Sequence, residues 1–255
     1  MLISAGLLYS TSDIPPVELS SYSYKNNRMT AVSGREAMST VRDEFVKVLG
    51  PLTGNADADL QMTMEFYSKN VELYEKSHVG DDFYRGPLVL AEATKKYLGN
   101  DHDARILDVA CGTGKAAEEL LSRGFSNLDG LDPNKEMLYY SESKKFYKHL
   151  FNVYLDDTTN AAAPDGAYDV ACCAGGFVPG HIPAEGLRDM VNKVKKGGFV
   201  INVMREAYLD HPFFKDKLMN AIRQMKEEKV IESQEISQVD YFNGLKGLLM
   251  VFKRL

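Results

Sequence analysis

One loop in the sequence has the residue types and spacing of a ligand site, DVACGTGKAAEEL at residues 108–120. Gly112, Gly114 and Ala117 stand in the G-x-G-x-x-G/A spacing that lets a backbone turn tightly and approach a ligand. The helix that we expect from Lys115 onward would direct free N–H groups and a partial positive charge at that ligand. The spacing alone is compatible with a pyrophosphate, with a different ligand, or with no more than a tight turn.

A second acidic residue follows this loop at the distance that a bound ribose requires. Asp132 ends the next expected strand, 18 residues after Gly114, and a carboxylate in that place can bind both ribose hydroxyls. NAD, FAD and S-adenosylmethionine each contain such a ribose, so Asp132 does not separate these cofactors. The alternative is structural, because an acid before Pro133 and Asn134 can form a turn or cap a helix.

Asp108 distinguishes among these cofactors because it lies inside the strand that leads into the loop. A dinucleotide fold usually has an uninterrupted apolar strand before its first glycine, whereas here a carboxylate precedes Gly112 by four residues. A negative charge at this point would oppose a pyrophosphate and would attract a cationic ligand. The amino group and sulfonium of S-adenosylmethionine are such a cationic end.

Three further residues are candidates for the acceptor side of a reaction. His181 lies in a Gly/Pro-rich loop after the fourth expected strand, and an imidazole can accept a proton near neutral pH. Its alternative role is to cap the next helix or to shape the pocket. Arg205 and Tyr208 follow the fifth expected strand and are predicted to contact substrate, with plain surface exposure as their alternative.

Strands alternate with helices around these residues, which indicates βαβ units and a parallel sheet. The expected strands are 105–109, 128–131, 151–155, 168–174 and 199–204, and the expected helices between them are 115–123, 134–148 and 184–196. A helix at 213–228 is followed by strand-like runs at 232–242 and 245–253, with the hairpin signal Asn243-Gly244 between them. We therefore predict a doubly wound, mostly parallel sheet of seven strands with an antiparallel C-terminal hairpin.

The residues before the sheet divide into an arm and a helical part. Residues 1–34 are rich in Ser, Tyr, Asn and Pro without a period, and we expect a flexible arm. Apolar residues at spacings of three and four predict helices at 36–49, 60–77 and 87–98. Residues 35–255 are then expected to form a single domain.

Composition limits the partners and the compartment. The chain has 255 residues and a net charge of −6, and this acidic balance does not favour nucleic acid, whose binding proteins usually carry a basic face. The three cysteines are Cys111, Cys172 and Cys173, an odd number that fits a reducing compartment and predicts a cytoplasmic protein without a metal site. No apolar run is long enough to span a membrane, and MLISAGLLYS at the start lacks the basic region of a signal peptide.

Residues 107–114 resemble the first motif of class I S-adenosylmethionine-dependent methyltransferases. The resemblance covers about residues 105–253, and it continues in LDPNKEML at 131–138, YDV at 168–170, VKKGGF at 194–199 and the hairpin. A narrower resemblance is to the methyltransferase-like proteins of the Williams–Beuren-region type. It rests on FY at 66–67, YE at 74–75, YRGP at 84–87, the DVACGTG loop and GHIP at 180–183.

This resemblance implies a Rossmann-like core at 101–255, a helical lid at 35–100, and a set of cofactor-binding residues. The methionine end of the cofactor would be held by Asp108 and by the loop residues Ala110, Gly112 and Gly114, and its ribose by Asp132. The adenine would pack on Pro133 and Met137, and its edge would meet Asp157 and Thr158. The floor below the methyl group would be formed by Ala174 and Gly175. Tyr74 and Arg85 of the lid would bind the cofactor carboxylate, although helix packing is their alternative role and the favoured one for Tyr67.

Three functions follow from the sequence. The first is a methyltransferase that acts on a small-molecule acceptor; the second is a cofactor-binding protein whose main role is a partner interaction; the third is an NAD-dependent oxidoreductase. Asp108 and the closing hairpin argue against the oxidoreductase. The segment AGGF at 174–177 lacks the Asn/Asp-Pro-Pro-aromatic run of enzymes that methylate base amino groups, which also argues against nucleic acid.

Overall fold

The computed structural model describes residues 56–77, 84–155, 163–210, 212–242 and 244–255, which all lie within one compact unit, Leu52–Leu255. The predicted arm at 1–34 and the predicted helix at 36–49 lie outside the described residues, as do Asp157 and Thr158.

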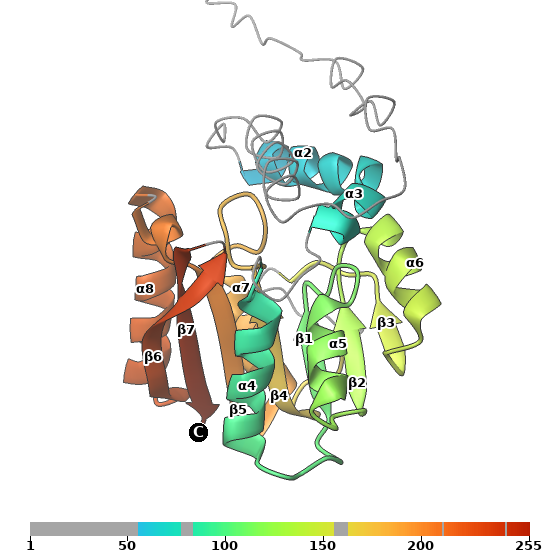
Figure 1. Ribbon diagram of the computed structural model, residues 1–255. Coiled ribbons are helices and arrows are strands. Elements are labelled where there is room, and N and C mark those ends of the chain that lie inside the picture. The colour runs from blue at the N-terminus through green and yellow to red at the C-terminus, as the bar shows by residue number, and fades with distance from the viewer. Residues whose placement is uncertain (1–55, 78–83, 156–162, 211, 243) are drawn as a thin grey trace, which may run out of the picture. The chain divides into compact units, whose positions relative to one another are not determined.

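A seven-stranded sheet with the order β3-β2-β1-β4-β5-β7-β6 forms the centre of this unit (Figure 1). The strands are β1 (Ile106–Val109), β2 (Leu128–Leu131), β3 (His149–Phe151), β4 (Tyr168–Ala174), β5 (Val194–Arg205), β6 (Ile231–Phe242) and β7 (Leu245–Arg254). Strands β1 to β5 pair in parallel, whereas β7 runs antiparallel to both β5 and β6. This confirms the predicted fold class, a doubly wound and mostly parallel sheet with an antiparallel C-terminal hairpin.

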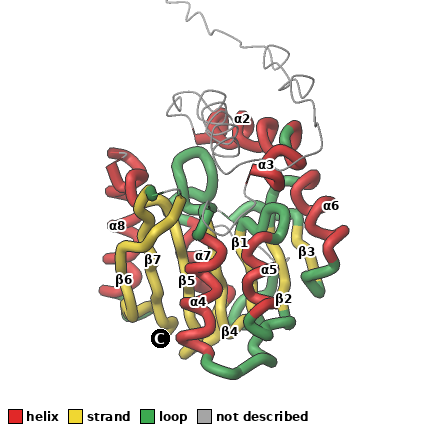
Figure 2. The backbone as a smooth tube through the Cα atoms, in the orientation of Figure 1, coloured by secondary structure: helices red, strands yellow, loops and turns green. Residues whose placement is uncertain are grey.

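Helices cover both faces of the sheet (Figure 2). The described helices are α2 (Ala56–Lys69), α3 (Val71–Ser77), α4 (Gly86–Leu98), α5 (Lys115–Ser122), α6 (Lys135–Lys144), α7 (Gly186–Lys193) and α8 (Pro212–Glu227), with a short 3₁₀ helix η3 (Glu206–Asp210). One core packs α4 and α5 against alternate strand residues such as Ile106, and the other packs α7 and α8 against Leu107 and Val109. Because both faces are buried, the central strands are almost continuously apolar, and Asp108 is an exception that requires a reason.

Helices α2 and α3 lie across the edge of the sheet where the parallel strands end (Figure 1). The Asn134 amide donates hydrogen bonds to the Met64 carbonyl at 2.9 Å and to Ser68 Oγ at 3.0 Å, which attach α2 to the start of α6. The sequence predicts one helix at 60–77, but the structure divides it at Asn70. The Asn70 side chain donates to the Phe66 carbonyl at 2.9 Å, which satisfies a carbonyl at the end of α2.

Several element boundaries differ from those expected. The third strand begins at His149 and ends at Phe151, because Lys145 adopts a left-handed conformation with φ 60° and ends α6 early. Helix α7 ends at Lys193 instead of continuing to 196. There the Arg254 guanidinium donates to the Asn192 carbonyl at 2.7 Å, which satisfies the helix end and lets β5 begin at once.

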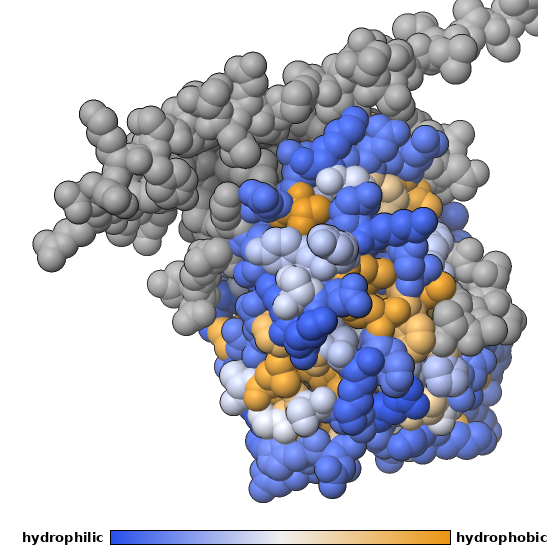
Figure 3. Space-filling model, turned by 90° about the vertical axis from the view of Figure 1, so that its right-hand side faces the viewer, coloured by the Kyte–Doolittle hydropathy of each residue, from blue (hydrophilic) through white to orange (hydrophobic). Residues whose placement is uncertain are grey.

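Among the described residues, no helix is long and apolar enough to cross a membrane. The face shown in Figure 3 is mostly hydrophilic over its described part, and apolar residues form separate patches within it.

Candidate functional site

The glycine-rich loop after β1 has an unusual backbone. Ala110, Gly112 and Gly114 have φ of 55°, 53° and 89°, a left-handed region that costs a residue with a side chain about 1–2 kcal/mol. The Gly114 N–H donates to the Cys111 carbonyl at 2.8 Å, which closes the turn just before α5. A Cβ on Gly112 would meet nothing nearer than Tyr74 Oη at 4.0 Å, so the loop backbone is open to a ligand on this side.

Asp108 is almost fully buried in β1 and has a single described hydrogen-bond partner, Tyr147. The Tyr147 hydroxyl donates to Asp108 Oδ2 at 2.6 Å. Burial raises the pKa of Asp108 to about 7, and the charge of Asp132 adds to this effect while the Tyr147 hydrogen bond opposes it. A carboxylate held at this pKa gains stability when a cation approaches, which is the property expected of a residue that binds an amino group.

Asp132 links the glycine-rich loop to the start of α6. Its Oδ2 accepts a hydrogen bond from the Gly112 N–H at 2.9 Å, and its Oδ1 accepts one from the Asn134 N–H at 2.8 Å. Burial raises its pKa to about 6, although both backbone hydrogen bonds oppose that rise. The contact with Asn134 is the structural role foreseen for this residue. A carboxylate accepts up to about four hydrogen bonds, so two acceptor positions are left for ribose hydroxyls.

The start of α6 provides the surface predicted for the adenine. The Asn134 side chain accepts a hydrogen bond from the Met137 N–H at 3.0 Å and caps the helix. Met137 is buried beneath this first turn, whereas Pro133 is only partly buried. The Asn152 amide donates to the Pro133 carbonyl at 2.7 Å, so the segment after β3 fixes the position of Pro133.

An ion-pair cluster attaches α3 to this loop. Glu75 Oε1 lies 2.8 Å from the Nζ atoms of both Lys115 and Lys144, and Lys144 also pairs with Glu118 at 2.8 Å. Burial alone would raise the pKa of Glu75, but the hydrogen bonds from the two lysines outweigh it and lower the pKa. We call these four residues the Glu75 cluster. It gives a role to Lys115, the residue directly after Gly114, and it places α3 over the loop.

His181 lies beneath α2 and is hydrogen-bonded through its side chain and its backbone. Its Nε2 is 2.9 Å from Tyr67 Oη, its Nδ1 is 3.4 Å from the Pro179 carbonyl, and its own carbonyl accepts a hydrogen bond from Tyr154 Oη at 2.6 Å. Burial lowers the pKa of His181 to about 4, and the contact with Pro179 opposes this effect. The imidazole is therefore neutral at physiological pH, and its Nε2 is hydrogen-bonded to the Tyr67 hydroxyl.

Two tyrosines from distant segments meet above the end of β4. Tyr84 Oη and Tyr241 Oη are 3.4 Å apart, and their rings pack edge to face with centroids 5.3 Å apart. Gly175, which follows Ala174 at the end of β4, has φ 77°, and a Cβ there would lie 2.8 Å from Tyr84 Oη and 3.0 Å from Tyr241 Oη. Only glycine fits this place, so both hydroxyls lie directly against the predicted floor.

The two predicted arginines occupy different surroundings. Arg205 ends β5, and its guanidinium lies 5.8 Å from the centroid of the Tyr208 ring. Arg85 precedes α4, and its side chain lines a groove between α4 and β6 with Val239 and Asp240. No contact of Arg85 with the glycine-rich loop occurs among the described residues, so its predicted role in cofactor binding remains a prediction.

The edge of the sheet thus brings together most of the predicted residues, which come from β1, β2, β4, β5, α3 and the loop of His181. Tyr147 and Tyr241 were not predicted. Tyr147 fell inside the helix expected at 134–148, and Tyr241 looked like an ordinary residue of an alternating strand. Glu75 entered the sequence analysis only as part of the YE pair. The sequence signal for its partner Lys115 was the position of this lysine directly after the glycine-rich loop.

The fold is the Rossmann-like methyltransferase fold, as indicated by the sheet order, the antiparallel hairpin, Asp108 within β1 and Asp132 directly after β2. Residues 106–198 match the family model described as a methyltransferase domain. This segment, about a third of the chain, is similar to a methyltransferase domain, and the cofactor of that class is S-adenosylmethionine.

Two curated proteins are similar to parts of the chain. The chain is 32% identical over 143 residues to methyltransferase-like protein 27 of Homo sapiens, a match that covers 56% of this chain and 57% of the human protein. It is also 35% identical over 71 residues to the putative methyltransferase YqeM of Bacillus subtilis, covering 27% of this chain and 28% of that protein. The matched segments thus span about half and about a quarter of these relatives' lengths.

Solved structures share the fold at low sequence identity. Magnesium protoporphyrin IX methyltransferase from Synechocystis PCC 6803, solved with bound SAH, is 13% identical with a TM-score of 0.57, covering 77% of this chain and 100% of that one. The [4+2]-cyclase SpnF is 15% identical with a TM-score of 0.57, covering 76% of this chain and 95% of that one. A cyclase among the neighbours means that the fold alone does not define the reaction.

Proposed function

We propose that the protein is an S-adenosylmethionine-dependent methyltransferase that acts on a small-molecule acceptor. The observation that carries the proposal is the pair of buried carboxylates, Asp108 and Asp132, on the two sides of the open Gly112 backbone. In the proposed complex, Asp108 would hold the cationic amino acid end of the cofactor and Asp132 would hold its ribose. A pyrophosphate cofactor would meet two negative groups in this place.

The residues present fit this cofactor. Gly112 has open space above its backbone, Asp108 can accept hydrogen bonds from an ammonium group, and the partly buried Pro133 is an apolar residue beside Asp132. When bound, S-adenosylmethionine supplies a methyl group on a sulfonium, which an acceptor lone pair attacks in line while the carbon–sulfur bond breaks. The chain contributes orientation and exclusion of water, and the Glu75 cluster supports the second role by holding α3 over the loop.

Removal of a proton from the acceptor would involve Tyr67 and His181 together. Since Tyr67 occupies His181 Nε2, we propose that an acceptor hydroxyl would pass its proton to Tyr67 Oη while Tyr67 passes its own to the imidazole. A base with a pKa of about 4 gives only modest assistance. We therefore propose that His181 mainly positions Tyr67 and contributes less as a proton acceptor.

The net charge of the chain and the tyrosines near the site support a small-molecule acceptor. The chain carries a net charge of −6, which disfavours nucleic acid, and tyrosines from several elements lie near the end of β4. We also propose a reducing compartment such as the cytoplasm, because all three cysteines are free and buried.

Calorimetry and isotope transfer test the proposed function. We expect micromolar binding of S-adenosylmethionine and S-adenosylhomocysteine, no binding of NAD, and transfer of a labelled methyl group to a metabolite pool. Absence of saturable S-adenosylmethionine binding would contradict the proposal. Binding without transfer to any small molecule would instead favour the cofactor-binding protein with a partner interaction.

A further inference from the structure

Five tyrosines converge on the acceptor side of the site from five different elements. They are Tyr67 (α2), Tyr74 (α3), Tyr84 (before α4), Tyr208 (η3) and Tyr241 (β6), and we call them the tyrosine wall. The rings of Tyr67 and Tyr74 pack edge to face at 5.7 Å, and those of Tyr84 and Tyr241 do so at 5.3 Å. Burial raises the pKa of Tyr67, and the nearby phenols of Tyr74, Tyr208 and Tyr241 add to this effect.

The tyrosine wall is uncharged. Burial raises the pKa values of Tyr67, Tyr74, Tyr84 and Tyr241 above the ordinary value of a phenol. His181 beside Tyr67 is neutral because burial lowers its pKa to about 4. The wall therefore offers aromatic faces and neutral hydroxyls, which suit a planar ring with polar substituents.

Arg205 is a cation beside this uncharged surface, with its guanidinium 5.8 Å from the centroid of the Tyr208 ring. Its Nε atom is buried and has no hydrogen-bond partner within the part of the chain that the structure describes, and its positive charge lowers the pKa of Tyr241 in opposition to burial. By contrast, the guanidinium groups of Arg105, Arg123 and Arg188 each pair with a carboxylate at 2.7 Å.

Glu206 and Asp240, on elements beside Arg205, are bonded to other groups. Glu206 accepts a hydrogen bond from the Gln238 amide at 2.8 Å, and Asp240 pairs with Lys246 at 2.7 Å. Asp108 and Asp132 are held by Tyr147 and by the loop backbone. A partly buried guanidinium that has no carboxylate partner among the described residues is costly. Its fork of N–H donors matches a carboxylate.

We propose that the acceptor is a planar aromatic molecule that carries a carboxylate, with its ring against the tyrosine wall and its carboxylate on Arg205. This inference rests on the proposed function, because it places the acceptor beside the floor at Gly175. It also excludes a cationic acceptor. An aromatic wall alone could attract a quaternary ammonium group, but the guanidinium would repel it.

Binding measurements on the full chain saturated with S-adenosylhomocysteine test the inference. The probes are benzoate, 4-hydroxybenzoate, cinnamate and indole-3-acetate, each compared with its neutral amide, and cyclohexanecarboxylate as an acid without an aromatic ring. We expect at least one aromatic acid to bind about tenfold or more tightly than its amide, as loss of a charged hydrogen-bonded pair implies. We also expect cyclohexanecarboxylate to bind more weakly than benzoate.

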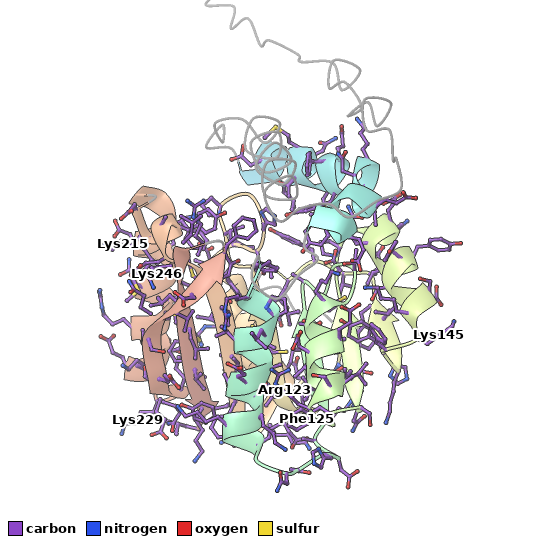
Figure 4. The ribbon with its side chains drawn as sticks, in the orientation of Figure 1. Arg123, Phe125, Lys145, Lys215, Lys229 and Lys246 are labelled. Atoms are coloured by element: carbon purple, nitrogen blue, oxygen red, sulfur yellow. The ribbon has the colours of Figure 1, made fainter. Side chains whose placement is uncertain are left out.

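Variants assign the effect to Arg205. Arg205→Met should abolish the preference for the acid over the amide, and Arg205→Lys should retain part of it. Lys246→Met is the matched control, because Lys246 is a half-exposed cation near the hairpin turn that already pairs with Asp240 (Figure 4). It makes the same change of charge, and it should behave as the wild type does.

The outcomes separate this inference from the proposed function. If the wild type binds S-adenosylhomocysteine but no aromatic acid binds more tightly than its amide, or if Arg205→Met keeps the preference, the inference is wrong and the proposed function stands. Binding of cyclohexanecarboxylate as tight as that of benzoate would also overturn it. If S-adenosylhomocysteine itself does not bind to the wild type, the proposed function fails and the inference fails with it.

Discussion

Tyr147 and Asp108 form a 2.6 Å hydrogen bond between the segment before β3 and the middle of β1. Asp108 is only 1% exposed, so this hydroxyl is the described group that partly replaces water around the carboxylate. The contact explains how the protein keeps an acid inside an apolar strand, and it sets the pH range in which that acid is ionised.

Tyr147→Phe should shift cofactor binding to higher pH. Burial raises the pKa of Asp108 to about 7, and the Tyr147 hydrogen bond opposes this rise, so its loss raises the pKa further. The ionised carboxylate is the form that attracts the ammonium group of the cofactor. The affinity for S-adenosylmethionine, measured by calorimetry from pH 6 to pH 9, should therefore rise with pH in both proteins. In the variant this rise should occur at a higher pH.

The control for this variant is Tyr139→Phe, since Tyr139 is 78% exposed on α6. It should leave the pH profile of cofactor affinity unchanged. A profile for Tyr147→Phe that coincides with the wild type would contradict a role for Asp108 in binding the cofactor.

Asp108→Asn should make the stability of the apoprotein less dependent on pH. Burial raises the folded-state pKa of Asp108 from 3.8 to about 7, so the folded state binds this proton more tightly than the unfolded state. Its contribution to stability is complete below about pH 4 and is lost as the pH rises through about 7. Between pH 5 and pH 8 the wild type should lose about 1–3 kcal/mol more unfolding free energy than the variant.

Urea denaturation at the two pH values measures this difference. Asp103→Asn is a suitable control because Asp103 is exposed before β1, and it should follow the wild type. Equal losses in Asp108→Asn and the wild type would mean that Asp108 is not buried as an acid of raised pKa.

Glu75→Gln should weaken cofactor binding more than it weakens the fold. Glu75 is the shared partner of Lys115 and Lys144, and its loss frees α3 from the loop while leaving the sheet intact. We expect the Kd for S-adenosylhomocysteine to rise by about three- to tenfold, consistent with about 1 kcal/mol for a partly buried ion pair.

Glu119→Gln provides the matched control for the Glu75 cluster. Glu119 pairs with Arg123 at 2.7 Å along α5, and Arg123 lies near the end of the sheet opposite to α2 and α3 (Figure 4). This variant also removes one ion pair of α5, but it should leave the Kd unchanged. A similar rise in both variants would assign the effect to α5 itself and not to the attachment of α3.

The sequence was sufficient for the fold because its local signals agree with the tertiary structure. Glycines end α4 and α5 where the apolar periodicity stops, and the strands buried on both faces are recognisable as apolar runs. The third strand was misplaced because its limits depend on Lys145, whose left-handed conformation has no signal in a lysine. It is also short, and a three-residue strand gives little pattern.

The site was predictable only where function imposes a local spacing. Asp108 and Asp132 stand at fixed distances from Gly112, and this spacing identified them. Tyr147 and Tyr241 contribute through contacts across 39 and 157 residues of sequence, and no local pattern contains such a contact. For the same reason the sequence could not show that Tyr67 occupies the imidazole of His181.

Gly175→Ala should destabilise the fold and displace the Tyr84–Tyr241 pair. Its φ of 77° disfavours any side chain, and a Cβ would come within 2.8 Å of Tyr84 Oη. Gly197→Ala is the control that separates these two costs, because Gly197 has φ 84° but no atom within 4 Å of the position that a Cβ would take. Both variants carry the conformational cost of about 1–2 kcal/mol, and only Gly175→Ala carries the clash.

Thermal or urea unfolding of both variants gives the clash as the difference between them. We expect Gly175→Ala to lose about 1–3 kcal/mol more than Gly197→Ala. The double variant Gly175→Ala with Tyr84→Phe should recover part of that difference, since it removes the oxygen that the new methyl group meets. Equal stabilities of the two single variants would show that the tyrosine pair moves freely away from the end of β4, and the floor that we assign to Gly175 would then not be rigid.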